Sequence, residues 1–194
     1  MQIVLVRPGV TDYDDQGRIK GRLDLPMNDR GVAQVDTTVE ELASVLDATG
    51  LDSVFCGPDE ASRATAESLA TAQDAKVKVV DRFCNLDVGL WQGKLIEEIK
   101  ANQPKVYRRW QGNPESVCPP EGEMVEAAQQ RLREGLTRIA KRYPDSRVAI
   151  VVAEPLASLL QSELTQAPPV DLWQAECKGS RWEIVNVPRE LVAS

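Results

Sequence analysis

The chain opens with the stretch Met-Gln-Ile-Val-Leu-Val-Arg-Pro-Gly at residues 1–9. Its apolar and β-branched residues predict a short buried strand over Gln2–Val6, because Pro8 and Gly9 punctuate the chain directly afterwards. Four further segments are predicted as strands: Ser53–Cys56, Val77–Val80, Arg147–Val152 and Arg181–Val187. The last of them alternates polar and apolar residues, which is typical of an edge strand.

Segments with helical spacing of apolar residues lie between these strands. The predicted helices are Gly31–Leu46, Ala61–Ala72, Glu123–Tyr143 and Pro155–Leu164, and Thr11–Arg30 is predicted as a long loop. Strands that alternate with helices predict an α/β fold, a three-layer sandwich with a largely parallel central sheet and helices on both faces. Ligands bind beyond the carboxyl ends of such strands, so functional residues are expected there.

The composition is that of an ordinary globular protein. The length of 194 residues fits one domain over residues 1–194. The formal net charge of −7 argues against nucleic acid or an anionic membrane as a partner. The four cysteines, Cys56, Cys84, Cys118 and Cys177, lie far apart and indicate reduced thiols. The amino terminus does not resemble a signal peptide, so we expect a cytoplasmic protein.

Histidine is missing from the sequence altogether. This excludes Ser-His-Asp triads, Cys-His dyads, metal sites with histidine ligands and phosphohistidine intermediates.

Six ordered segments resemble the histidine phosphatases, the phosphoglycerate-mutase-like family. Residues 5–11, Leu-Val-Arg-Pro-Gly-Val-Thr, are similar to the family signature Leu-Val-Arg-His-Gly-Glu-Thr. Residues 21–28 are similar to its Gly-Arg-x-Asp-x-Pro-Leu-Asn segment. The remaining similar segments are residues 54–58 with 65–67, residues 89–93, residues 120–123, and residues 150–155. The resemblance implies the family's fold, with a cap-like insertion at about residues 85–122.

The family places two histidines, two arginines and a carboxylic acid around one phosphoryl group. The corresponding positions here are Arg7, Pro8, Ala61, Asn85 and Glu154, and the asparagine that often follows the family's first signature falls at Asp14. Of these, only the first arginine, Arg7, keeps the family's residue. The histidines fall at Pro8 and Glu154, the second arginine at Ala61, and the acid at Asn85. The resemblance therefore implies a vestigial pocket, because the loss of a nucleophile alone lowers turnover by roughly a million-fold.

We therefore predict a catalytically inactive pseudoenzyme with no cofactor or metal, which binds an unknown protein partner or a non-phosphorylated small ligand. The family resemblance also makes a homodimer one of the possible partnerships. We also predict that Glu154 takes the place of the phosphate and pairs with Arg7, because an uncompensated buried guanidinium is costly. The alternative is a repurposed phosphatase or hydrolase, in which the carboxylates Glu154 and Asp14, or a metal, replace the histidines. A pure assembly component, recognisable by a large exposed apolar patch, is a third interpretation.

Other chemistry is less well supported by the sequence. A cysteine phosphatase requires Cys-x5-Arg, whereas the spacing from Cys56 to Arg63 is one residue too long, so Cys56 is interpreted as a small buried residue. An acidic cluster follows the first strand and consists of Asp12, Asp14 and Asp15. It could bind a hard cation, although such clusters are usually only solvated. The four tryptophans are interpreted as core or cap packing: Trp91, Trp110, Trp173 and Trp182.

Overall fold

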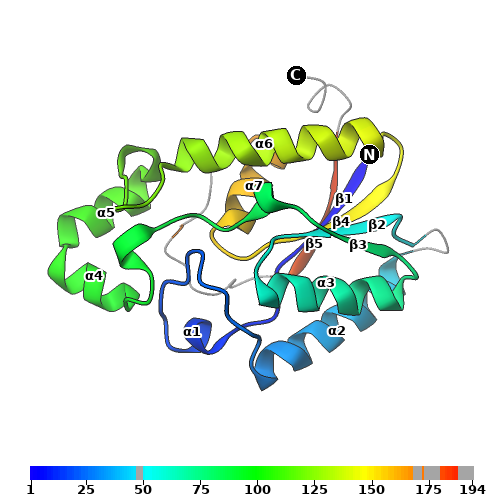
Figure 1. Ribbon diagram of the computed structural model, residues 1–194, viewed down its shortest axis with the longest axis horizontal. Coiled ribbons are helices and arrows are strands. Elements are labelled where there is room, and N and C mark those ends of the chain that lie inside the picture. Colours follow the sequence, from blue (N-terminus) through cyan, green and yellow to red (C-terminus); the bar gives the residue numbers. More distant parts are fainter. Residues whose placement is uncertain (47–49, 168–171, 173–179, 188–194) are drawn as a thin grey trace.

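The computed structural model describes residues 1–46, 50–167, 172 and 180–187 (Figure 1). Two residues singled out from the sequence, Trp173 and Cys177, lie outside the described residues. Within the described ranges, no helix is both long enough and apolar enough to cross a membrane.

A five-stranded sheet with the order β3-β2-β4-β1-β5 forms the centre of the molecule. Its strands are β1 (Gln2–Val6), β2 (Ser53–Cys56), β3 (Lys76–Val79), β4 (Arg147–Val151) and β5 (Trp182–Asn186). Neighbouring strands are parallel, except that β5 pairs antiparallel with β1 at one edge. The predicted α/β fold with a largely parallel sheet is confirmed.

Helices cover both faces of this sheet, with α6 and α7 on one side and α2 and α3 on the other (Figure 1). These helices are α2 (Asp29–Val45), α3 (Glu60–Ala72), α6 (Val125–Arg142) and α7 (Leu156–Thr165). Because side chains alternate along a strand, Leu5 packs in the core that contains α6 and α7, whereas Val4 and Val6 pack in the core that contains α2 and α3. The two cores fix the register of β1 and hence the direction in which the chain leaves it.

Local sequence explains where the helices begin. Asn28 caps α2, because its side-chain oxygen accepts a hydrogen bond from the Gly31 backbone at 2.9 Å, and Asp59 caps α3 in the same way. Gly31 also lets α2 approach the loop after β1, since a Cβ at this position would collide with the carbonyl oxygen of Val10. The first turn of α2 therefore supports the loop that follows β1.

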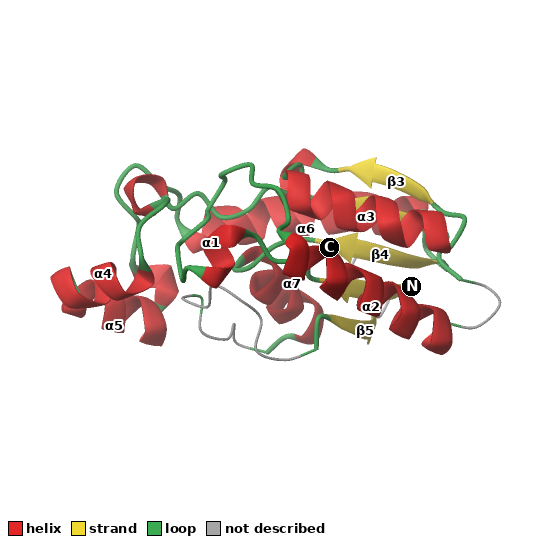
Figure 2. Cartoon of the chain, turned by 90° about the horizontal axis from the view of Figure 1, so that it is seen from below, coloured by secondary structure: helices red, strands yellow, loops and turns green. Residues whose placement is uncertain are grey.

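A helical segment projects beyond the carboxyl ends of the parallel strands (Figure 2). Its α-helices are α4 (Ile96–Asn102) and α5 (Pro104–Gly112), and its 3₁₀ turns are η1 (Asp81–Phe83), η2 (Gly89–Trp91) and η3 (Pro114–Ser116). Pro104 begins α5, a position where the missing N–H costs nothing. This segment lies at the same end of the sheet as the loops that follow β1 and β4.

One prediction about local structure is wrong. Residues Thr11–Arg30 were predicted as loop throughout, but Asp12–Asp15 form the short helix α1 and α2 already begins at Asp29. Thr11 and Asp14 close a capping box around its first turn. Four residues are too few for an apolar periodicity, so only the cap residues could have signalled this helix.

Candidate active site

The site forms where β1 and β4 end side by side. Arg7 follows β1 directly, and Glu154 lies three residues after the end of β4. The structure places Nε of Arg7 2.7 Å from Oε1 of Glu154. The side chains of Arg7 and Glu154 are only 8 % and 9 % exposed, so solvent screens this charge-assisted pair weakly.

The two other nitrogens of the Arg7 guanidinium also have side-chain acceptors. Nη1 lies 3.5 Å from Oε1 of Glu183, and Nη2 lies 3.4 Å from Oε1 of Gln161. Both distances are long for hydrogen bonds, whereas the Nε contact to Glu154 has the length of a strong one. Gln161 and Glu183 are joined to each other at 2.8 Å. Arg7 therefore has a short contact with one carboxylate and longer contacts with Glu183 and Gln161.

The second carboxylate oxygen of Glu154 is held at the start of α7. Oε2 accepts hydrogen bonds from the Ser158 hydroxyl at 2.7 Å and from the Ser158 backbone N–H at 3.2 Å. The helix N-terminus carries a partial positive charge, which also favours a carboxylate there. Glu154 is thus fixed from both sides, by Arg7 and by Ser158.

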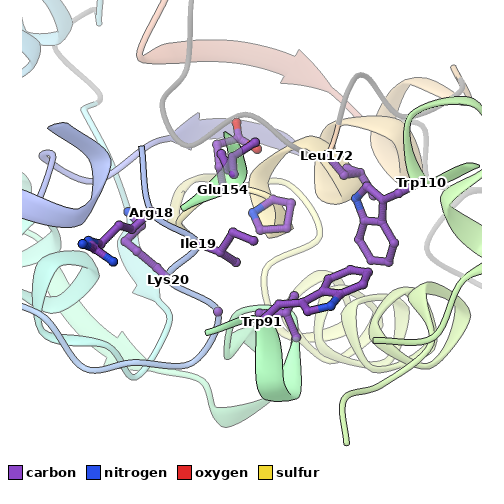
Figure 3. Close-up of a pocket in the computed structure, with 11 residues that line it drawn as sticks. Arg18, Ile19, Lys20, Trp91, Trp110, Glu154 and Leu172 are labelled. Atoms are coloured by element: carbon purple, nitrogen blue, oxygen red, sulfur yellow. The ribbon is translucent and has the colours of Figure 1, made fainter. Parts of the chain in front are cut away.

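A small pocket of about 30 Å³ lies next to Glu154 (Figure 3). Its lining consists of two cations, one carboxylate and mostly apolar groups: Arg18, Ile19, Lys20, Gly21, Val88, Trp91, Ile96, Trp110, Glu154, Pro155 and Leu172. The rings of Trp91 and Trp110 pack edge to face, with centroids 5.5 Å apart. This volume is enough for about two water molecules. The pocket can therefore hold water beside Glu154.

Asp14 lies in a different environment from Glu154. Its carboxylate accepts hydrogen bonds from the Thr11 backbone N–H at 2.7 Å and from the Thr11 hydroxyl at 2.9 Å. A carboxylate oxygen of Asp14 also lies 2.8 Å from Nζ of Lys20. Asp14 is not among the residues that line the pocket. It holds α1 and the loop after β1 in place.

Two positions where the resemblance places a histidine and an arginine, Pro8 and Ala61, are buried. Pro8 is buried, and its carbonyl accepts a hydrogen bond from the side chain of Arg181. Ala61 is buried in the first turn of α3, and Arg63, two residues later, lies 3.8 Å from Asp24. The described ion pair of Arg63 is thus with Asp24, and the described ion pairs of Arg7 are with Glu154 and Glu183.

Asn85 supports the backbone of Glu154. Its Nδ2 donates a hydrogen bond to the Glu154 carbonyl at 2.9 Å, and its Oδ1 accepts one from the Leu86 backbone N–H. Arg131 in turn donates to the carbonyl oxygens of Asn85 at 3.1 Å and Arg82 at 2.8 Å. Asn85 therefore links the end of η1 to the loop after β4.

Sequence reasoning missed three residues that complete the site: Ser158, Gln161 and Glu183. Ser158 could have been found, since it follows Glu154 by four residues and such spacing brings side chains together on a helix. Glu183 could have been noticed as a charged residue within the otherwise uncharged strand Trp182–Asn186. Nothing in the sequence signalled Gln161.

The described part of the chain holds no cluster of three or more histidine, cysteine, aspartate or glutamate side chains that could bind a metal ion. Cys56 lies at the end of β2, and burial raises the pKa of its thiol to about 12. At neutral pH this thiol is protonated, so it is a poor nucleophile.

A family model decides the relationship of the chain to known proteins. The model described as the histidine phosphatase superfamily (branch 1) matches residues 3–190. The chain belongs to this superfamily.

Relatives within the histidine phosphatase superfamily include named phosphatases. Phosphoserine phosphatase 1 of Hydrogenobacter thermophilus is 25 % identical over 187 residues, which covers 96 % of this chain and 87 % of the relative. The adenosylcobalamin/alpha-ribazole phosphatase of Escherichia coli is 21 % identical over 96 % of this chain and 90 % of the relative. A solved structure of a mycobacterial glucosyl-3-phosphoglycerate phosphatase with VO3 superposes with a TM-score of 0.79, at 24 % identity and with 94 % and 91 % of the two chains covered.

These relatives correct the predicted function. The expectation of a catalytically inactive pseudoenzyme is contradicted, because superfamily members that match nearly the whole chain are named as phosphatases. The predicted alternative, a phosphatase or hydrolase that uses other groups, agrees better with this finding. The physical reason for the error is that a missing residue type excludes one mechanism of hydrolysis and leaves others open.

Proposed function

We propose that the chain is a hydrolase of phosphate monoesters that works without a phosphohistidine intermediate, with Glu154 as the general base. The names of the relatives support phosphatase activity as the reaction class. The composition supports the departure in mechanism, since the chain has no histidine and has Pro8 and Glu154 where the resemblance places the two family histidines. The observation that carries the proposal is that Glu154, whose carboxylate is fixed by Arg7, is also one of the residues that line a water-sized pocket.

Arg7 is assigned to the phosphoryl group. Its Nε holds Glu154 at 2.7 Å, while the contacts at Nη1 and Nη2 are long and easily exchanged. Two phosphoryl oxygens can take the places of Glu183 and Gln161 on these nitrogens, because a guanidinium matches phosphate geometry in a bidentate manner. The phosphorus atom would then lie close to Glu154.

Glu154 is assigned to the attacking water. The carboxylate takes a proton as the water oxygen bonds to phosphorus and the bond from phosphorus to the ester oxygen breaks. The same proton then passes to the departing alkoxide, so that a monoester and water give an alcohol and inorganic phosphate. Positioned proton transfer of this kind contributes about 10² to 10⁴ in rate.

The same carboxylate opposes substrate binding. At an effective dielectric constant near 20, a unit charge about 4 Å from another like charge is repelled by about 4 kcal/mol. We therefore expect a high KM, with Arg7 offsetting the repulsion only in part.

The test is hydrolysis of a panel of phosphate monoesters from about pH 5 to about pH 8, with EDTA and with added magnesium or manganese. Glu154→Gln is compared with Glu183→Gln, which removes the same charge beside the same arginine but at a residue that does not line the pocket. Both variants should lower KM, because each removes repulsion of the phosphate. Only Glu154→Gln should lower kcat, by about 10² to 10⁴.

Two outcomes would overturn the proposal. One is background hydrolysis by the wild-type chain on every monoester tested. The other is an equal effect of the two substitutions on kcat, which would show that Glu154 acts only through its charge. Activity that is lost in EDTA and restored by magnesium would replace the carboxylate with a metal as the activating group.

A further inference from the structure

We infer that Arg181 supplies a second guanidinium to the anion site, in addition to Arg7. This inference rests on the proposed function, since it extends the site assigned there to the phosphoryl group. It starts from charge: Arg7 is already compensated by Glu154 at 2.7 Å, and Glu183 lies within 3.5 Å of it. These three side chains together carry one net negative charge, and a cation next to Arg7 would offset it when a phosphate binds.

The pairing of β1 with β5 places Arg181 next to Arg7. Val6 lies opposite Trp182 in the antiparallel ladder, and the Arg7 backbone N–H donates a hydrogen bond to the Arg181 carbonyl at 2.8 Å. Arg7 and Arg181 are therefore the next opposed pair. Side chains of directly opposed residues leave the sheet on the same face, with Cβ atoms about 4.5–5.5 Å apart.

Neighbouring carboxylates distinguish this pair from an isolated surface pair of like charges. Directly opposed like charges destabilise a sheet, so the pair requires anions nearby. Two carboxylates, those of Glu183 and Glu154, lie on the same side of β1 and β5 as this pair. Glu183 follows Arg181 by two residues, so its side chain leaves the chain on the same face. Two arginines and two glutamates thus form one balanced group at the end of β1.

The contact of Arg181 with Pro8 shows which way its side chain extends. Its Nη2 donates a hydrogen bond to the carbonyl oxygen of Pro8, the residue directly after Arg7. The guanidinium therefore reaches the loop after β1, at the carboxyl end of the strands where Arg7 and Glu154 meet. A guanidinium has five N–H donors in a planar fork, so it can hold a carbonyl oxygen and bind an anion at the same time.

The experiment measures binding of inorganic phosphate to the full chain by isothermal titration calorimetry, separately from turnover. Arg181→Gln should weaken phosphate binding by about 10- to 100-fold, the loss expected for one charge-assisted contact. Arg181→Lys should recover part of the affinity. The matched control is Arg63→Gln, which removes the same charge from an arginine whose described partner is Asp24 and should change affinity by less than about threefold.

Folding is monitored by circular dichroism, and the glutamine in Arg181→Gln can still donate to the Pro8 carbonyl. Equal affinity of wild type and Arg181→Gln, or an equal loss in Arg181→Gln and Arg63→Gln, would overturn the inference. Phosphate binding that depends on Arg181 without any hydrolysis would uphold this inference and refute the proposed function. Hydrolysis with KM unchanged in Arg181→Gln would refute the inference alone.

Discussion

Two buried carboxylates at the crevice have almost the same contacts but different surroundings. Glu154 lies 2.7 Å from a nitrogen of Arg7 and accepts hydrogen bonds from the backbone and hydroxyl of Ser158. Asp14 lies 2.8 Å from Nζ of Lys20 and accepts hydrogen bonds from the backbone and hydroxyl of Thr11. Yet Glu154 lines the pocket and Asp14 does not.

This difference shows that the ion-pair and hydrogen-bond partners of a carboxylate do not by themselves identify it as reactive. In both cases one cation and one hydroxyl residue contact the carboxylate. Glu154 and Asp14 differ in the secondary-structure element that carries the carboxylate. Asp14 belongs to the helix that it caps, whereas Glu154 stands in a loop between a central strand and the helix that holds it.

The largest expected effect on stability comes from Arg7→Met. This substitution leaves the Glu154 carboxylate buried without its tightest cation, and breaking a buried pair from one side costs about 3–5 kcal/mol. Urea denaturation measures the change in the free energy of unfolding. The double variant Arg7→Met with Glu154→Leu should recover part of the loss, since it removes both charges.

The matching substitution at the other carboxylate is Lys20→Met. Its effect should be smaller than that of Arg7→Met, because Asp14 keeps the two hydrogen bonds from Thr11 in its own capping box. A loss below about 1 kcal/mol for Arg7→Met, in the range of exposed ion pairs, would show that the Arg7–Glu154 pair is not the tighter of the two.

The next effect in size is that of Asp14→Asn. The amide replaces an acceptor that serves Thr11 and Lys20, so we expect a loss of about 1–3 kcal/mol in the free energy of unfolding. The kcat of the folded protein should stay within about threefold of wild type, because Asp14 does not reach the pocket. A fall in kcat as large as that of Glu154→Gln would assign Asp14 to the chemistry.

The fold could be predicted because its three central strands, β1, β2 and β4, are short and largely apolar runs. Gln2–Val6, with Pro8 and Gly9 behind it, is a clear case, and β1 has these bounds in the structure. Helix α1 could not be predicted in this way, because its stability comes from a capping box rather than from an apolar stripe.

The site was only partly accessible from the sequence. The structure brings Arg7 and Glu154 together because both follow central strands that are neighbours and parallel, a consequence of topology that the alternating pattern implied. Glu183 and Arg181 come from the antiparallel edge strand, and their positions depend on its register with β1, which no local pattern sets. The functional prediction failed for another reason: composition excluded one mechanism, and the prediction treated this as the loss of all activity.

The smallest expected effect is that of Asp15→Asn, which compares an exposed aspartate of α1 with the buried Asp14. Asp15 is the exposed neighbour of Asp14, and its hydrogen bond with Arg30 lowers its pKa below the ordinary value of 3.8. A lowered pKa means that ionised Asp15 stabilises the folded state at pH values above 3.8, and that this contribution is lost as the pH falls through the folded-state pKa. Wild type should therefore melt slightly higher than Asp15→Asn near about pH 6, and the two should converge near about pH 2. A difference in Tm that persists unchanged at the lower pH would mean that Asp15 acts through packing or helix propensity, and the electrostatic contrast between the two aspartates would then not hold.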